Sequence, residues 1–224
     1  MQHSLKRIVS LWAINLVAFA GISTAQAEDA LELFENLVPV DDSKVAMAYI
    51  DPNADFTVFK RVKILDTFVA FPSGWERDQR RGTRGVRISA NDMERIKRDV
   101  AVLFQDVFTE VLEADNGFEV VDEAGDDVLL LRPAIIDLDI TAPDVMGAGR
   151  STSFTSTAGS ATIYLELYDS VSGQILGRAA DRTTIRNATG TISWSNRVTN
   201  TQDARRMFRG WATLLREFLD SHYM

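Results

Sequence analysis

Carboxylates are the main groups in this chain that could perform chemistry. The sequence has no cysteine and only two histidines, His3 and His222, which lie close to the two ends. Serine–histidine catalysis, thiol nucleophiles, disulfides and most zinc sites are therefore excluded. Asp137 and Asp139 share one face of an expected strand, and Asp144 follows the next turn. This spacing could place two or three oxygens near a hard cation.

Two other interpretations of these carboxylates are open. Paired acids could hydrolyse a glycoside, but the separation of carboxyl groups that this reaction needs cannot be inferred from sequence. Asp137 and Asp139 could also be the solvated face of a half-exposed strand, and we favour this interpretation. We accordingly predict no catalytic residue, no metal site and no cofactor.

The segment Gly74–Arg87, GWERDQRRGTRGVR, concentrates positive charge in an acidic protein, and we call it the arginine segment. It contains five arginines and two acids, whereas the whole chain has a net charge of -8. Guanidinium groups bind carboxylates and phosphates through a planar fork of donors, and Trp75 would add an aromatic face. The ligand-binding residues predicted by this pattern are Trp75, Arg77, Arg80, Arg81, Arg84 and Arg87.

Glycines within the arginine segment predict a mobile loop that leaves the end of a strand, because glycine weakens regular structure. The partner we expect for this loop is an anionic component of the cell envelope or an acidic envelope protein. Internal charge pairing is the alternative. Residues 106–144 contain twelve acids and only Arg132 as a base, so the fold itself could supply the partners.

The N-terminus has the features of an export signal. Lys6 and Arg7 precede the mostly apolar run Ile8–Ala20, and Ala25–Ala27 offers the small-residue pattern of a cleavage site. The apolar run is shorter than the roughly 20 residues of a membrane span, so cleavage is favoured over an uncleaved anchor. We expect a periplasmic protein that begins near Glu28, has no membrane span and, without cysteine, carries no lipid anchor.

Charge and composition then suggest the domain organisation. Loss of residues 1–27 removes two of the 24 basic residues and none of the 32 acids, so the net charge becomes -10. A chain this acidic is not expected to bind nucleic acid. We predict a signal peptide at 1–27, an acidic tether at 28–48 and a single α+β domain at 49–222.

Apolar periodicity predicts the elements of this domain. Two long amphipathic helices are expected at about 89–116 and 201–222, with apolar residues three and four apart. Strands are expected at about 60–71, 126–141, 161–168 and 174–185, and the last two form a hairpin. Alternation in the second strand places Ile136 and Leu138 on one face and Ile135 on the other. The helices would pack on a largely antiparallel sheet in a two-layer α+β domain.

Four stretches of the sequence resemble a known family. They are YIDPNADFTVFKRV, VFTEVLEADNGFEVVDEAGDDVLLLRPAIIDL, LYDSVSGQILGRAADR and WATLLREFLD. From about Tyr49 to Asp220 the chain is similar to the bacterial envelope proteins of domain of unknown function 3313 (DUF3313). Many members look like lipoproteins, whereas this chain has no cysteine to acylate. The resemblance implies a place in the cell envelope and one domain, and it carries over no catalytic residue.

The sequence therefore favours an accessory or binding module without chemistry of its own. Such a module would engage an anionic envelope component or partner through the arginine segment. The alternative is a carboxylate-based hydrolase or metal-binding enzyme of the envelope, which would need Asp137, Asp139 or Asp144. A third reading, a structural domain of a larger envelope complex, predicts an exposed apolar patch.

Overall fold

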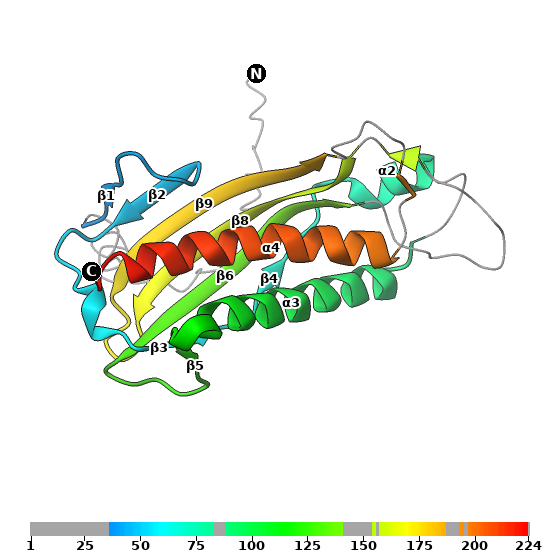
Figure 1. Ribbon diagram of the computed structural model, residues 1–224. Coiled ribbons are helices and arrows are strands. Elements are labelled where there is room, and N and C mark those ends of the chain that lie inside the picture. Colours follow the sequence, from blue (N-terminus) through cyan, green and yellow to red (C-terminus); the bar gives the residue numbers. More distant parts are fainter. Residues whose placement is uncertain are drawn as a thin grey trace, which may run out of the picture.

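The computed structural model describes residues 36–82, 88–140, 154–155, 157–186, 193–194 and 197–223. Two long helices lie side by side across one face of a twisted sheet (Figure 1). The α-helices are α2 (Trp75–Gly82), α3 (Ala90–Glu113) and α4 (Arg197–Asp220). Within the described residues, no helix combines the length and apolar character that crossing a membrane requires.

Eight strands form the main sheet. In spatial order they are β1 (Val38–Pro39), β2 (Met47–Ile50), β9 (Ile175–Arg186), β8 (Thr157–Asp169), β6 (Val128–Ile140), β3 (Arg61–Ile64) and β5 (Glu119–Val120), with β4 (Phe68–Val69) also paired to β6. The short strands β7 (Phe154–Thr155) and β10 (Ser193–Trp194) pair separately. The 3₁₀ turns are η1 (Phe56–Val58) and η2 (Ala114–Asn116).

The sheet is mixed, which corrects the expectation of a largely antiparallel one. Neighbouring strands from β1 through β2, β9 and β8 to β6 are antiparallel. By contrast, β3 and β4 run parallel to β6, and β5 runs parallel to β3. The chain passes from β4 through α2 and α3 before it returns in β5 and β6. Such a strand–helix–strand connection brings the next strand back in the same direction.

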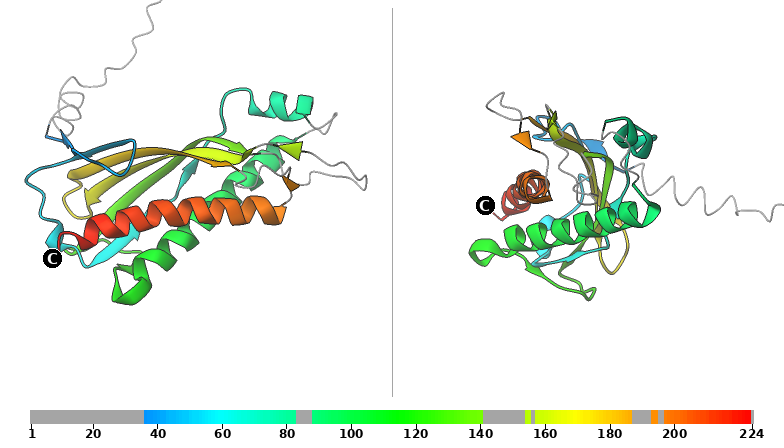
Figure 2. Two further views of the ribbon diagram at one scale, coloured as in Figure 1. Left: turned by 45° about the horizontal axis from the view of Figure 1, so that its top comes forward. Right: turned by 90° about the vertical axis from the view of Figure 1, so that its right-hand side faces the viewer.

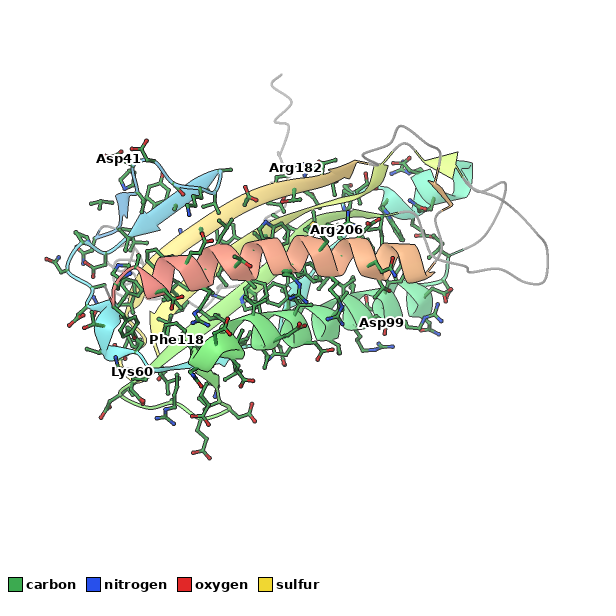
Figure 3. The ribbon with its side chains drawn as sticks, in the orientation of Figure 1. Asp41, Lys60, Asp99, Phe118, Arg182 and Arg206 are labelled. Carbon is green, nitrogen blue, oxygen red and sulfur yellow. The ribbon has the colours of Figure 1, made fainter. Side chains whose placement is uncertain are left out.

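The helix α3 begins where the sequence predicts it. The Ser89 side chain accepts a hydrogen bond from the backbone N–H of Asp92 at 3.1 Å, and the Asp92 carboxylate accepts from the backbone N–H of Ser89 at 3.1 Å. This capping box satisfies two N–H groups at the helix start. Farther along, Phe104 packs edge-on against Phe208 of α4, with 5.5 Å between ring centroids. Charged residues such as Arg206 cover the solvent side of the helix pair (Figure 3).

The hydrophobic core lies between α3, α4 and the face of the sheet that they cover, which we call the inner face. Its largest fully buried side chains are Phe56, Phe104, Phe108, Phe208, Leu112, Leu129, Leu131, Ile135, Leu138, Leu219, Val62 and Val107. Both helices and the central strands contribute to this set. The described part of the chain therefore has one continuous core.

A β-bulge in β6 changes which residues reach the core. The register shifts between Ile136 and Asp139, and Asp137 adopts a φ of 51°. The extra residue interrupts the alternation, so Ile135 and Leu138 are both buried in the core. The expectation that Ile136 and Leu138 share one face is therefore wrong.

Residues 36–48, which the sequence assigns to a tether, contain β1 and the first two residues of β2. β2 pairs with β9, and β1 pairs with β2 at one edge of the sheet. The segment 40–46 between these strands lies against α4, as the ion pair described below shows, and we call it the strap. Residues 1–35, with the predicted signal peptide and the start of the predicted tether, lie outside the described residues.

Candidate functional site

The arginine segment begins as a helix and not as the expected loop. Its first residues form α2, which lies at one end of the sheet, toward the face opposite α3 and α4 (Figure 2). Trp75 anchors this helix: the residue is 3% exposed and its ring stacks on Phe71, with 4.0 Å between centroids. The indole N–H donates to the carbonyl of Ile140 at 2.9 Å. The aromatic face expected for a ligand is thus buried in the core, because a large apolar ring gains most there.

The structure describes only some of the arginines of this segment. Arg77 is exposed on α2. Arg80 and Arg81 lie on the same helix, although their side chains are outside what the structure describes, and Arg84 and Arg87 lie outside the described residues altogether. Their role in ligand binding stays a prediction.

The strand carboxylates are not gathered into a site. Asp137 and Asp139 are both exposed on the bulged end of β6, and the Asp137 carboxylate lies 3.7 Å from the Arg182 guanidinium. Within the described ranges, no three His, Asp or Glu side chains are placed to hold a metal ion together. Asp144, the third expected carboxylate, lies outside those ranges.

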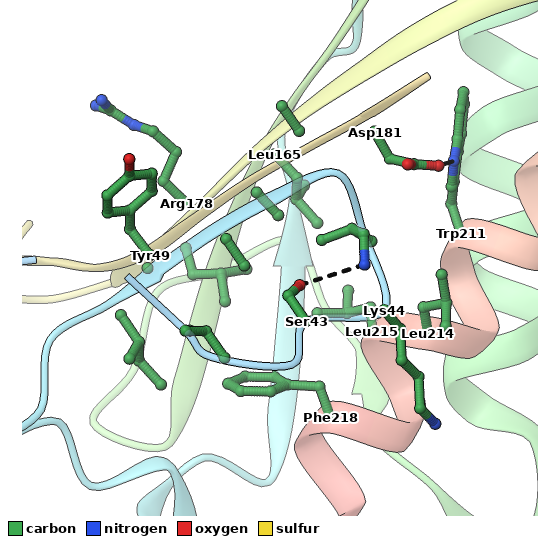
Figure 4. Close-up of a pocket in the computed structure, with 18 of the residues that line it drawn as sticks. Ser43, Lys44, Tyr49, Leu165, Arg178, Asp181, Trp211, Leu214, Leu215 and Phe218 are labelled. Atoms are coloured by element: carbon green, nitrogen blue, oxygen red, sulfur yellow. Dashed lines mark hydrogen bonds between the residues drawn. The ribbon is translucent and has the colours of Figure 1, made fainter. Parts of the chain in front are cut away.

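A cavity that the sequence does not predict lies between α4 and the sheet (Figure 4), and we call it the slot. It has a volume of about 340 Å³ and is partly open to solvent. The strap and the C-terminal half of α4 form its sides, and the inner faces of β2, β9 and β8 form its floor. Apolar side chains dominate the lining, among them Val45, Ile163, Leu165, Leu167, Leu214 and Phe218.

Small residues on neighbouring strands create the slot. Ala48 of β2, Ala179 of β9 and Leu165 of β8 lie directly opposite one another. Gly177 is two residues from Ala179 and therefore faces the same side. On this face, β9 carries Gly177, which has no side chain, and Ala179, which has one methyl group. The residues opposite them on β8 are Leu167 and Leu165. Leu167 packs close to Gly177, so the space beneath the strap is attributed to the small side chain of Ala179.

Asp181 joins the three walls at one end of the slot. Its carboxylate accepts a hydrogen bond from the indole N–H of Trp211 at 2.9 Å and from the backbone N–H of Ala46 at 3.2 Å. Because Asp181 belongs to β9, this carboxylate links the sheet, α4 and the strap; Figure 4 shows the bond to Trp211. A second link between strap and helix is the exposed ion pair of Lys44 with Glu217, at 2.8 Å. Such exposed pairs contribute little stability.

A second polar cluster occupies the opposite, outer face of the sheet. Glu166, whose side chain is 12% exposed, lies 3.2 Å from Arg132 and 3.0 Å from Arg178 on the two flanking strands. The hydroxyl of Tyr168 donates to Glu166 at 2.9 Å, and burial followed by this hydrogen bond raises the pKa of Tyr168. These residues pair directly across β6, β8 and β9, so we assign the cluster to sheet stabilisation.

Comparison with known protein families shows which family this chain belongs to. The family described as protein of unknown function (DUF3313) matches residues 26–215. The chain belongs to the DUF3313 family. This confirms the resemblance inferred from the sequence. No match is found among curated proteins.

Several solved structures are similar to this DUF3313 chain at low identity. The PelC dodecamer from Paraburkholderia phytofirmans shares 10% identity over 71% of this chain and 89% of that one, with a TM-score of 0.38. A DUF330 protein from Xanthomonas campestris shares 12% over 75% and 92%, also with a TM-score of 0.38. A neuraminyllactose-binding hemagglutinin homologue from Helicobacter pylori shares 10% over 73% and 87%, with a TM-score of 0.37. Similarity of this degree does not extend to ligand, partner or assembly.

One sequence signal for the slot exists in this DUF3313 chain. In β9, Gly177 and Ala179 occupy alternate positions, whereas Leu167 and Leu165 face them on the neighbouring strand β8. Consecutive small residues on one face of a buried strand indicate a close approach or a gap. Sequence alone could not supply the opposite wall, because the residues of the strap carry the acidic composition of a tether.

Proposed function

We propose that this DUF3313 protein is a binding module of the cell envelope that holds an apolar ligand in the slot and performs no chemistry of its own. The observation that carries the proposal is the slot itself, an apolar cavity of about 340 Å³. Ligand sites in proteins are commonly concave, mostly apolar cavities of roughly 300–1,000 Å³ with a few polar groups. The slot has this character.

The polar groups around the slot favour binding over catalysis. The carboxylate of Asp181 holds Trp211, and Lys44 is paired with Glu217. Both contacts join one wall of the slot to another, so these polar groups serve the structure of the slot. The two strand carboxylates that a hydrolase would need do not line the slot.

The proposed location is the periplasm. The basic start, the apolar run and the small residues before Glu28 support an export signal. We accordingly expect cleavage near Ala27 and a periplasmic protein that begins near Glu28.

Binding of an apolar dye, whose fluorescence depends on the polarity of its surroundings, tests whether the slot holds an apolar ligand. We expect a naphthylamine dye to bind the purified protein saturably, and Ala179→Leu to weaken binding by about tenfold because the new side chain displaces roughly two buried carbons. The matched control is Ala134→Leu, on the outer face of β6 opposite Tyr164, which should bind dye like the wild type. Equal dye affinity in the two variants, with unchanged melting temperatures, would contradict the proposal.

The arginine segment supports a second binding role at another surface. Arg77 is exposed on α2, and Arg80 and Arg81 follow on the same helix. We expect these residues to engage an anionic envelope component, such as a glycan or a lipid head group, or an acidic protein surface.

Changing Arg80, Arg81 and Arg84 together to Gln tests this second role. We expect the melting temperature to stay nearly unchanged while retention on anionic vesicles or glycans falls. Wild-type retention should weaken as salt rises, because salt screens exposed charges. A clear loss of stability with no change in retention would instead assign these arginines to the fold.

A further inference from the structure

We infer that the slot accommodates one unbranched hydrocarbon chain, so that the ligand is a single-chain amphiphile such as a fatty acid or a lysophospholipid. The inference rests on the proposed function and names the ligand class of the same site. It follows from the length of the slot, from its cross-section and from the way its polar groups are already engaged.

The elements that line the slot set its length. On β8 the lining extends from Ile163 to Leu167, four residue steps of about 3.3 Å, or about 13 Å. On α4 it extends from Trp211 to Ser221, ten steps of about 1.5 Å, or about 15 Å. A strand and a helix of matching length thus flank the cavity, which is about 14 Å long.

The cross-section of the slot is that of a single chain. Dividing the volume of 340 Å³ by about 14 Å gives a mean section of about 24 Å². Non-bonded carbons approach to about 4 Å, so an extended methylene chain fills a section of roughly 20 Å² and two parallel chains need about twice that. One extended chain therefore fits the slot.

Hydrogen bonds join the walls of the slot at one end. There, the Asp181 carboxylate accepts from Trp211 of α4 and from Ala46 of the strap. Along β9 the inward positions then run from Asp181 through Ala179 to Gly177. We place the methyl end of the chain toward Trp211, where these links hold the walls together, and the head group toward Ser221.

The charged groups nearby do not select a head group. Lys44 and Glu217 have opposite charges, are paired with each other and are 71% and 51% exposed. Water and salt screen such groups, and exposed pairs are worth up to about 1 kcal/mol, or roughly fivefold in affinity. Recognition therefore resides in the hydrocarbon chain.

The length of the hydrocarbon chain should determine the affinity of the ligand for the slot. Each buried methylene contributes about 0.8 kcal/mol, which is roughly fourfold in affinity. An extended chain advances about 1.25 Å per carbon, the projection of a bond of about 1.5 Å, so about eleven carbons fill 14 Å. Affinity should rise about fourfold per carbon and stop rising near eleven or twelve carbons.

The experiment is a titration of the protein, produced from the full chain, with carboxylate and trimethylammonium amphiphiles of six to fourteen carbons below their micelle concentrations. Displacement of the naphthylamine dye reports the affinity. We expect the plateau near eleven or twelve carbons with either head group, with affinities that agree within about fivefold at each length. Ala179→Leu should move the plateau to about half that length, because Ala179 lies midway along the slot, and Ala134→Leu should leave it unchanged.

The outcomes separate the ligand class from the proposed function. If the dye binds and Ala179→Leu weakens it, but affinity does not follow chain length or branched chains bind equally well, the inference of a single-chain ligand is wrong and the binding function stands. An unmoved plateau in Ala179→Leu also refutes the inference. If neither dye nor amphiphile binds, both the ligand class and the proposed function are wrong.

Discussion

Among the glycines that the structure describes, Gly117 is the position where one added methyl group should destabilise this protein most clearly. It follows the C-terminal end of α3, and the guanidinium of Arg216 from α4 lies directly over it. That guanidinium donates to the carbonyls of Leu112 at 3.1 Å and Ala114 at 2.8 Å, which are among the last carbonyls of the helix. A Cβ on Gly117 would lie 2.0 Å from Nη1 of Arg216 and 2.2 Å from the Leu112 carbonyl oxygen.

The cost of Gly117→Ala can be estimated from these contacts. Displacing Arg216 removes a part-buried and an exposed hydrogen bond from a charged donor, together worth about 2–3 kcal/mol. The clash with the Leu112 carbonyl also requires a shift of the backbone, which costs about 1–2 kcal/mol. We expect a total loss of about 3–5 kcal/mol in the free energy of unfolding. For a chain of this size that lowers the melting temperature by about 10 °C.

Urea denaturation followed by circular dichroism measures this loss. Gly210→Ala is the matched control, because Gly210 is exposed on α4 and its added methyl group meets no atom within 4 Å. That change should stabilise the protein by about 0.5–1 kcal/mol, as alanine does within helices. The double variant Gly117→Ala with Arg216→Ala separates the two clashes, since only the one with the Leu112 carbonyl remains. A Gly117→Ala protein within about 1 kcal/mol of the wild type would refute the reasoning.

Three further predictions concern the core, the response to acid and the N-terminus. Phe104→Ala should lower the free energy of unfolding by about 3–5 kcal/mol, measured in urea, because Phe104 is fully buried. Hydrogen bonds, above all from the backbone N–H of Ser172, hold the pKa of Asp169 below its ordinary value of 3.8. The stabilisation is therefore present above about pH 3.8 and is lost as the pH falls further, so Asp169→Asn should reduce the difference between urea midpoints at pH 6 and pH 3. Intact mass of the exported protein should show a start near Glu28, and a Met1 start in the membrane fraction would contradict cleavage.

Local signals predict the long elements of this fold well. Ser89 and Asp92 cap α3 as their types and spacing indicate. The β8–β9 hairpin turns through Gly173, which has a φ of 71° that favours glycine. These features depend on residues that are close in the chain, and a sequence displays such residues directly.

The arginine segment shows where local signals mislead. Its glycines predict a loop, but Gly74 precedes α2 with a φ of 82° and Gly82 is the last residue of the helix. Between these two ends, Trp75 fixes the helix by packing on Phe71 and by bonding the carbonyl of Ile140. The bond to Ile140 joins residues far apart in the chain, so the composition of the segment itself does not reveal it.

The slot could not be predicted for the same reason. Its walls come from three parts of the chain, at 40–50, 163–181 and 211–221, and only the fold brings them together. The bulge at Asp137 is similar, because an unbroken alternation in the sequence hides the one residue that does not pair.

The strap is the turn of a hairpin as well as a wall of the slot. The strands β1 and β2 on either side of it pair with each other, and β2 pairs with β9. A ligand in the slot would contact the strap and the floor that β2 and β9 form beneath it. Ligand binding and the pairing of these edge strands should therefore depend on each other, and such coupling is reciprocal in free energy. Filling the slot should accordingly stabilise this edge of the sheet.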